Sequence, residues 1–379
     1  MTSWRIPFNR AEAAGNELRY VAEAVEGGHL AGSGPFTARC EALLAQTLGA
    51  PRVLLTTSGS HALELAALLL DLRPGDEVVV PAFSFVTSAS AFVLRGARVV
   101  FSDVRRDTLN LDERLLPELV TERTRAVVAV HYGGIAAELD ALCALASERG
   151  LTLVEDNAHG LFASYRGRPL GAFGRFAAQS FHETKNVCSG EGGAIVLNDG
   201  GDVERAEILR EKGTDRVRFL RGDVAAYTWV DVGSSFAPSE LLAAFLAAQL
   251  ERAHEIQSAR RRIWERYDDG LADWADRNGI RRPVVPEHVE QAYHLYYLLL
   301  PERRSRDRLI ESLAERGILA VFHYQPLHLS SMGRREGGRS GQCPVAEDVA
   351  ERLVRLPFFT ALAPAEQDEV IDVVQAFEP

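Results

Sequence analysis

The segment RFAAQSFHETKNVCSGEGGAIVLN, residues 175–198, holds two short apolar runs joined by a glycine-rich bend. The runs FAAQSFH (176–182) and GAIVLN (193–198) predict two β-strands, because short apolar runs bounded by turn residues are typical of buried strands. Side chains alternate along a strand, so Ser180 and His182 are expected on the same face of the first one. The segment therefore predicts a strand, a bend and a second strand, with a hydroxyl and an imidazole close together.

Similar runs precede this segment and are separated by helical patterns. They are RVLLTT (52–57), EVVVPA (77–82), RVVFSD (98–103), RAVVAVHY (125–132) and LTLVEDN (151–157). Several are apolar on both faces, as are strands of a parallel sheet that is covered by helices. The intervening segments, such as HALELAALLLDL (61–72) and ELDALCALASERG (138–150), have helical periodicity. This alternation predicts an α/β domain with a mostly parallel sheet.

Beyond Pro238 the regular alternation ends. The later pattern predicts helices over 239–274, 305–316, 345–355 and 364–377, and strands over 293–300 and 318–324. The glycine-rich, charged stretch 329–343 predicts a mobile loop. A chain of 379 residues is longer than one hydrophobic core usually serves. We therefore predict a large α/β domain over residues 1–238 and a smaller α+β domain over residues 239–379.

The composition, 46% hydrophobic and 25% charged, is that of a soluble globular protein. A net charge of -11 argues against a nucleic-acid partner, because phosphate backbones need a basic surface. The four cysteines lie far apart with no CxxC pair, which fits a reducing cytoplasm better than a disulfide scaffold or a zinc site. The first residues, MTSWRIPFNR, contain no apolar run, and the most apolar helical stretch, 241–250, is too short to span a membrane. We expect a cytoplasmic protein without a membrane or nucleic-acid partner.

Lysine is almost absent from this chain. Of 42 basic residues 40 are arginine, so that Lys185 and Lys212 are the only lysines. Schiff-base chemistry would therefore have two candidate amines besides the amino terminus. A lysine in a loop is usually a solvated charge, but Lys185 follows Ser180 and His182 and precedes the bend SGEGG (189–193). We expect Lys185, rather than Lys212, to be functional.

Two further segments end strands with polar residues. Ser58-Gly59-Ser60 precedes a helix that starts near His61, and a helix amino terminus suits a phosphate. For this segment alone, an ordinary serine cap is the favoured interpretation. Glu155-Asp156-Asn157 follows the strand LTLV, at the sheet edge where open α/β sheets bind ligands. An aspartate that only caps a turn is the common alternative.

The segment VFHYQPLH (321–328) places His323 and His328 on either side of Tyr324 and Pro326. This spacing is not that of metal ligands on a helix, so we predict no metal site here. Contact of the two histidines with a substrate is the hypothesis that we retain.

The motifs SGSHAL, PAFSFVTSA, EDNAH, SFHETKN, SGEGGAIV and AVFHYQPLH occur in that order along nearly the whole chain. Together they resemble the DegT/DnrJ/EryC1/StrS aminotransferases, which are fold-type-I enzymes that use pyridoxal 5'-phosphate and act on nucleotide-linked keto-sugars. SFHETKN, together with REKGTDR (210–216) and YTWVDVGSS (227–235), is similar to the branch that makes dTDP-4-amino-4,6-dideoxyhexoses.

The resemblance implies two catalytic residues. Lys185 matches the lysine that forms the Schiff base with the cofactor, and Asp156 matches the carboxylate that pairs with its ring nitrogen. An anionic Asp156 would keep that nitrogen protonated, which strengthens the ring as an electron sink. A lysine at a desolvated or cationic site has a lowered pKa, so it can form an imine and later act as a base.

The resemblance also implies contacts around the cofactor and the substrate. They are Ser60, the backbone of His61 and Ser180 at the phosphate, Phe85 stacked on the ring, His159 beside the ring hydroxyl, His182 in the same pocket, and His323 and His328 at the substrate. Many members have G-Y-N-Y-R where this chain has Gly233-Ser234-Ser235-Phe236-Ala237. The asparagine of that motif reaches the cofactor phosphate of the partner subunit, so Ser235 is the matching residue and alanine replaces the arginine.

The implied reaction transfers an amino group, with glutamate as the expected donor, to C4 of a dTDP-4-keto-6-deoxyhexose. The resemblance and the commonness of twofold assemblies imply a homodimer. The arginines that would meet the diphosphate are Arg210, Arg216, Arg218, Arg221 and those of the 334–339 loop, although each alone is more simply a solvated surface charge. The alternatives are an enzyme that aminates C3 and a non-catalytic regulator with the same fold. Lys185 argues against a sugar 3-dehydratase, since the family's dehydratases have histidine at that position.

Overall fold

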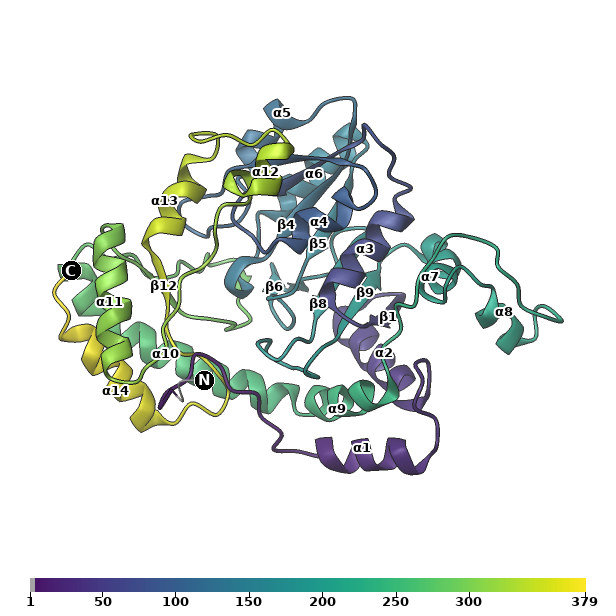
Figure 1. Ribbon diagram of the computed structural model, residues 1–379, viewed down its shortest axis with the longest axis horizontal. Coiled ribbons are helices and arrows are strands. Elements are labelled where there is room, and N and C mark those ends of the chain that lie inside the picture. Colours follow the sequence, from purple (N-terminus) through teal and green to yellow (C-terminus); the bar gives the residue numbers. More distant parts are fainter. Residues whose placement is uncertain (1–3) are drawn as a thin grey trace.

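A seven-stranded sheet forms the centre of the computed structural model, which describes residues 4–379 (Figure 1). The strand order is β1-β9-β8-β5-β4-β2-β3. The strands are β1 (Arg52–Thr56), β2 (Glu77–Pro81), β3 (Arg98–Ser102), β4 (Thr124–Val130), β5 (Thr152–Asp156), β8 (Phe176–Ser180) and β9 (Gly193–Leu197). Each of them falls in one of the seven predicted runs. Only β9 is antiparallel to its neighbours, so the prediction of a mostly parallel sheet is confirmed.

Both faces of this sheet are buried, as the apolar runs predict. In β2, Val78 and Val80 belong to one hydrophobic cluster and Val79 to another. In β1, Leu54 likewise faces the first cluster, while its neighbours face a third that is built with helices. Burial of each such side chain contributes roughly 1.5–3 kcal/mol, which is why alternation of polar and apolar residues is missing here.

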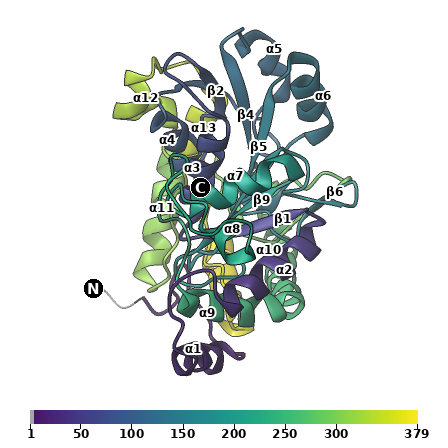
Figure 2. The same ribbon diagram turned by 90° about the vertical axis from the view of Figure 1, so that its right-hand side faces the viewer.

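Helices cover the two faces of the sheet. Those of the first 238 residues are α1 (Glu17–Glu26), α2 (Pro35–Leu48), α3 (Gly59–Leu69), α4 (Thr87–Val93), α5 (Leu116–Leu119), α6 (Leu139–Arg149), α7 (Val203–Arg210) and α8 (Arg216–Arg221). Figure 2 shows α1 near one end of the molecule and α5 and α6 at the other. The segment that contains α8 projects from the body at the right of Figure 1.

A second core lies in the carboxyl-terminal part. That part contains α10 (Ala253–Arg277), β11 (Tyr297–Leu299), α11 (Arg303–Glu315), α12 (Ser331–Arg335), α13 (Pro344–Arg352), β12 (Leu353–Arg355) and α14 (Pro364–Gln375). The second core takes residues from α10, β11, α11, β12 and α14, whereas the buried apolar residues of α13 belong to the first cluster. Strands β11 and β12 pair antiparallel, and α10, α11 and α14 pack together beside them. A small sheet of β6 (Ser164–Tyr165), β7 (Arg168–Pro169) and β10 (Val289–Glu290) links the two parts.

Several predictions for this part are wrong in detail. The helix predicted over 239–274 breaks at Arg252 into α9 (Glu240–Glu251) and α10. The strand predicted over 318–324 consists only of isolated bridges, and the one predicted over 293–300 shortens to β11. The stretch 329–343, predicted as an irregular loop, contains α12, because Ser330 caps a helical turn by accepting a hydrogen bond from the N–H of Gly333 at 3.0 Å.

The division between the two parts differs from the boundary predicted at residue 238. Helix α9 packs on α1 and α2, and its buried residues join the cluster that covers β1. The second cluster begins at Ile263 and also takes in Ile6, which forms a bridge with Ile318. We therefore propose that the boundary lies within α10. None of the helices within residues 4–379 is both long and apolar enough to cross a membrane. The first three residues of the segment MTSWRIPFNR lie outside the described residues.

Candidate active site

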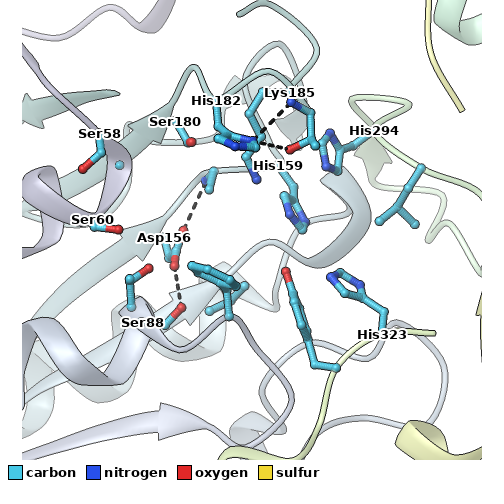
Figure 3. A pocket seen from close by; sticks show the side chains of 18 of the residues that line it. Ser58, Ser60, Ser88, Asp156, His159, Ser180, His182, Lys185, His294 and His323 are labelled. Atoms are coloured by element: carbon cyan, nitrogen blue, oxygen red, sulfur yellow. Dashed lines mark hydrogen bonds between the residues drawn. The ribbon is translucent and has the colours of Figure 1, made fainter. Parts of the chain in front are cut away.

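A cavity of about 520 Å³ opens where the carboxyl ends of β5 and β8 meet the start of α3 (Figure 3). Its wall combines residues of both parts of the chain. The polar lining residues include Ser58, Ser60, Ser88, Asp156, His159, Ser180, His182, Lys185, Glu191, His294, His323, Tyr324 and Arg355. Parallel strands end at a common edge, so residues far apart in sequence converge here.

Lys185 lies at the cavity wall, five residues beyond Ser180, the last residue of β8. Its backbone N–H donates to the carbonyl of His182 at 2.9 Å, which fixes the turn that follows β8. Burial lowers the pKa of Lys185 to about 8, and the negative charge of Asp156 opposes this shift. A substantial share of neutral amine is therefore present near neutral pH, as a nucleophile requires. Lys212 does not line this cavity; its side chain is 60% exposed beside Glu211.

Asp156 is the last residue of β5 and is 6% exposed. It accepts hydrogen bonds from the hydroxyl of Ser88 at 2.6 Å and from the N–H of Ala158 at 3.2 Å (Figure 3). Sequence reasoning missed Ser88, which lies in the first turn of α4 within the motif PAFSFVTSA. Both bonds go to carboxylate oxygens and hold the group toward the cavity, so Asp156 is more than a turn cap.

The start of α3 forms the end of the cavity opposite the histidines. Ser58 caps the helix by accepting from the N–H of His61 at 3.1 Å, so the cap interpretation holds for that serine. Ser60 and Ser180 line the cavity beside it. Gly59 permits the close approach of α3 to β8, since a Cβ there would lie 2.9 Å from the Cβ of Ser180. Free N–H groups and hydroxyls at this corner suit a phosphate.

His61 itself is turned away from the cavity. Its ring hydrogen-bonds to the hydroxyl of Thr57 and packs edge-on against Phe236, with centroids 5.2 Å apart. Its N–H is already donated to Ser58, so the phosphate contact expected from the His61 backbone would have to compete with this cap.

A cluster of histidines forms another wall. The rings of His159 and His294 stack with centroids 4.1 Å apart, and Nδ1 of His323 lies 2.9 Å from the hydroxyl of Tyr132 (Figure 3). Burial lowers the pKa of all three histidines well below the usual value, and the positive charge of Lys185 adds to the effect. These rings are therefore neutral. His294 was not expected, because nothing in the run YHLYYLLL distinguishes it from a strand residue.

Phe85 and His182 are both placed at the cavity. Phe85 is 54% exposed and lies near Tyr324, with ring centroids 6.3 Å apart. An aromatic ring this exposed within a cavity wall is available to stack on a planar ligand. His182 has Nδ1 2.9 Å from the hydroxyl of Thr184, which orients its ring beside Lys185.

Besides His61, two predicted site residues lie outside the cavity. His328 is fully buried, and its Nε2 lies 2.9 Å from Glu347. The expected substrate contact of His328 is therefore wrong in this structure, because the short helix that begins after Pro326 turns the ring inward. Ser235 is exposed and forms a bridge with Glu211, so it does not contact the cavity of its own chain.

The comparisons with known proteins agree with this geometry. A sequence model of the DegT/DnrJ/EryC1/StrS aminotransferase family matches residues 12–375. The chain belongs to this family. The spore coat polysaccharide biosynthesis protein SpsC of Bacillus subtilis is 30% identical over 378 residues, covering 98% of this chain and 96% of SpsC.

Solved structures of aminotransferases share the fold. DesV of S. venezuelae, solved in complex with a ketimine intermediate, is 34% identical, with a TM-score of 0.89 and coverage of 98% of each chain. Spr1654 of Streptococcus pneumoniae, described as a sugar aminotransferase, is 28% identical over 98% of this chain. Its PMP form and PLP form give TM-scores of 0.91 and 0.90 and are covered to 98% and 97%. The fold is therefore that of the aminotransferases that depend on pyridoxal phosphate, and the cofactor is pyridoxal 5'-phosphate.

The residues of the cavity fit this cofactor. A lysine with a lowered pKa and a buried carboxylate line one enclosed space. The start of α3 adds hydroxyls and backbone N–H groups at one end, and the exposed ring of Phe85 lies on the wall. These are an amine for the aldehyde, an anion for the ring nitrogen, donors for the phosphate and a planar surface for the ring.

Proposed function

We propose that this aminotransferase moves an amino group from glutamate to C4 of a dTDP-4-keto-6-deoxyhexose, giving the dTDP-4-amino-4,6-dideoxyhexose. The observation that carries the proposal is the pair Lys185 and Asp156 in one cavity with the phosphate corner at α3. The motif SFHETKN, with the segments 210–216 and 227–235, supports the choice of C4. The names of Spr1654 and SpsC, which refer to a sugar and to a polysaccharide, support a sugar acceptor.

The roles of this chain's residues follow from their positions. Pyridoxal phosphate, when bound, supplies an electron sink for the carbon that bears the amine. Asp156, held by Ser88, would keep the ring nitrogen protonated. Lys185, as a neutral amine in a buried wall, would take the proton from one carbon and return it to another. The neutral rings of His159 and His323 would give hydrogen-bonding groups without adding charge.

Ser60, Ser180 and Phe85 are the remaining contacts that we propose for the cofactor. Ser60 and Ser180 would donate hydroxyl hydrogen bonds to the phosphate at the start of α3. Phe85 would cover one face of the ring and exclude water from it. His182 would stay beside Lys185 as a polar group at the mouth of the cavity.

The arginines expected at the diphosphate are engaged elsewhere. Arg210 is buried against Glu41 at 2.5 Å, and Arg221 lies 2.8 Å from Glu207. Arg216 and Arg218 also lie within 4.0 Å of glutamates, and none of these arginines lines the cavity. The expectation that Arg210 binds a diphosphate is therefore wrong, because its charge already has a buried partner.

A homodimer is part of the proposal. Six large apolar side chains on the projecting segment after α7 are exposed: Phe219, Leu220, Tyr227, Trp229, Val230 and Val232. An apolar group of this kind typically marks a protein interface. Ser235 is exposed at the base of the same segment, so a second copy of the chain would bring it toward the partner's cavity, as its motif implies. A cytoplasmic location, supported by the reduced cysteines, is retained as a prediction.

The test is product analysis with a panel of acceptors. The purified protein with bound cofactor is incubated with glutamate and either a dTDP-4-keto-6-deoxyhexose or its 3-keto isomer, and the products are identified by NMR. We expect an amine at C4 from the first acceptor only. Amination of the 3-keto isomer alone would contradict the C4 assignment and leave the enzyme class intact. A protein that binds the cofactor but aminates no sugar would favour the regulator alternative.

A further inference from the structure

Arg355, the last residue of β12, lines the cavity but has no part in the cofactor contacts described above. Its guanidinium carbon lies over the ring of Phe8, 4.6 Å from the ring centroid. Within residues 4–379 its side chain makes one hydrogen bond, a long one from Nη2 to the carbonyl of Phe322 at 3.4 Å. Its Nε is buried without an acceptor. Across residues 4–379, no aspartate or glutamate forms an ion pair with it.

Arg210 and Arg260, which are more deeply buried than Arg355, have close partners, although Nε of Arg210 likewise lacks an acceptor. Arg210 faces Glu41 at 2.5 Å, and Arg260 donates to the carbonyls of Tyr293 at 3.0 Å and His294 at 2.5 Å. Arg355 is partly buried, and a guanidinium that is withdrawn from water without such partners carries a desolvation cost. The cost disappears when an anion enters the cavity and accepts the free N–H groups. Arg355 therefore has guanidinium N–H groups that are available to an anionic ligand.

The backbone of Arg355 is held rigidly. Its N–H donates to the carbonyl of Val321 at 2.7 Å, its carbonyl accepts from Val321 at 3.1 Å, and β12 pairs it with Tyr297 of β11. Its charge acts on the reacting end of the cavity, because it contributes to the lowered pKa of Lys185 and of His159. Arg355 thus presents a fixed positive charge on the side where Lys185 lies.

We propose that Arg355 binds the α-carboxylate of the amino donor. The inference rests on the proposed function, since it assumes an amino acid donor. The α-carboxylate is attached to the carbon that bears the amino group, so it must lie close to Lys185 during transfer. A guanidinium fork matches the two oxygens of a carboxylate. The diphosphate of a nucleotide sugar is separated from the reacting carbon by the sugar ring, which places it farther from Lys185.

The experiment separates the two half-reactions of the enzyme with bound cofactor. The donor half is followed by the loss of visible absorbance of the lysine-bound cofactor as glutamate is added. The acceptor half is followed by the return of this absorbance when the nucleotide keto-sugar is added to the aminated enzyme. For R355Q we expect the donor efficiency to fall on the order of 10²-fold, as for loss of a charged hydrogen-bonded pair. The acceptor half should change by less than about threefold, and R355K should recover part of the donor loss.

A donor without the α-carboxylate gives a second, independent readout. 4-Aminobutyrate is glutamate without that group, so the wild-type enzyme should use it on the order of 10²-fold less well than glutamate. R355Q should use 4-aminobutyrate as well as the wild-type enzyme does. The matched control is R352Q, which removes a nearby guanidinium that pairs with Asp348 at 2.7 Å and does not line the cavity. It should leave both half-reactions unchanged.

Each other result overturns the inference in its own way. Equal losses in both half-reactions of R355Q would make Arg355 a structural support for Phe8. A loss confined to the acceptor half would assign it to the diphosphate. A wild-type enzyme that uses 4-aminobutyrate as well as glutamate would show that no group recognises the α-carboxylate. A wild-type enzyme that accepts glutamate but aminates no sugar would contradict the proposed function. The donor half-reaction of R355Q would then still test the assignment of Arg355.

Discussion

At the scale of single residues, the proposed reaction depends on one amine, that of Lys185, whose pKa is lowered by its surroundings. Lys185 is buried at a cavity wall next to neutral histidines, whereas Lys212 is solvated. The sequence alone indicated Lys185 because the chain has a single other lysine and because a strand end, a hydroxyl and an imidazole surround this one. It could not indicate Ser88, His294 or Arg355, since these residues reach the cavity only through contacts between distant segments.

Capture of the cofactor should follow the lowered pKa of Lys185. Its pKa falls from 10.5 to about 8, and the neutral amine is the reactive form. The rate at which the apoenzyme forms the visible band with pyridoxal phosphate should rise about tenfold per pH unit below pH 8 and level off above it. Stopped-flow absorbance measures this rate. A rate that still rises tenfold per unit at pH 10 would contradict the shift.

The two lysines give a matched pair of variants for the same measurement. Lys212→Ala should keep the profile, and Lys185→Ala should form no band. Borohydride reduction followed by peptide mapping should label Lys185 in the wild-type protein. A label on Lys212 would refute the assignment.

At the scale of elements, the strands of the central sheet and the helices α11, α13 and α14 were predictable, whereas the short carboxyl-terminal strands and the break between α9 and α10 were not. Strands such as β2 are fixed by local composition, because all five residues are buried and every residue after Glu77 is apolar. The segment 318–324 is as apolar, but its partners are Ile6 and Arg355, so it forms two bridges instead of a ladder. No local pattern shows that a partner strand is missing. The break between α9 and α10 is likewise set by packing on two different cores.

The junction of β9 with α3 depends on a glycine. A Cβ on Gly193 would lie 2.2 Å from the carbonyl carbon of Ser58 and 2.4 Å from the nitrogen of Gly59, both backbone atoms. Gly193→Ala should therefore displace the start of α3, destabilise the fold by roughly 1–3 kcal/mol and weaken cofactor binding. Thermal unfolding and titration with pyridoxal phosphate measure the two effects. Gly200→Ala, where a Cβ meets nothing within 4 Å, is the control, and equal behaviour of the two variants would contradict the argument.

At the scale of the whole molecule, the segment that contains α8 projects from the body (Figure 1). Its large apolar side chains are exposed. Trp229 is 78% exposed there, and a second copy would bury it. In Trp229→Glu the charge would have to enter that interface, so we expect dissociation into monomers by sedimentation velocity and weaker cofactor binding. Val284→Glu, at a side chain 47% exposed on the loop after α10, is the control and should stay dimeric. A wild-type protein that sediments as a monomer would contradict the homodimer.

The bridge between Ile6 and Ile318 has a consequence for the order of synthesis. Ile6 is synthesised long before the rest of its core, whose other members begin at Ile263. About 300 residues separate the two bridge partners. Translation at ~5–20 residues per second takes tens of seconds over this distance, and during that time the amino-terminal segment lacks its native contacts. The same segment carries Phe8 and Asn9 into the cavity wall. The nascent chain therefore completes its pocket only after Phe358 has been added, and until then the complete cofactor site is not available to assist the folding of the central sheet.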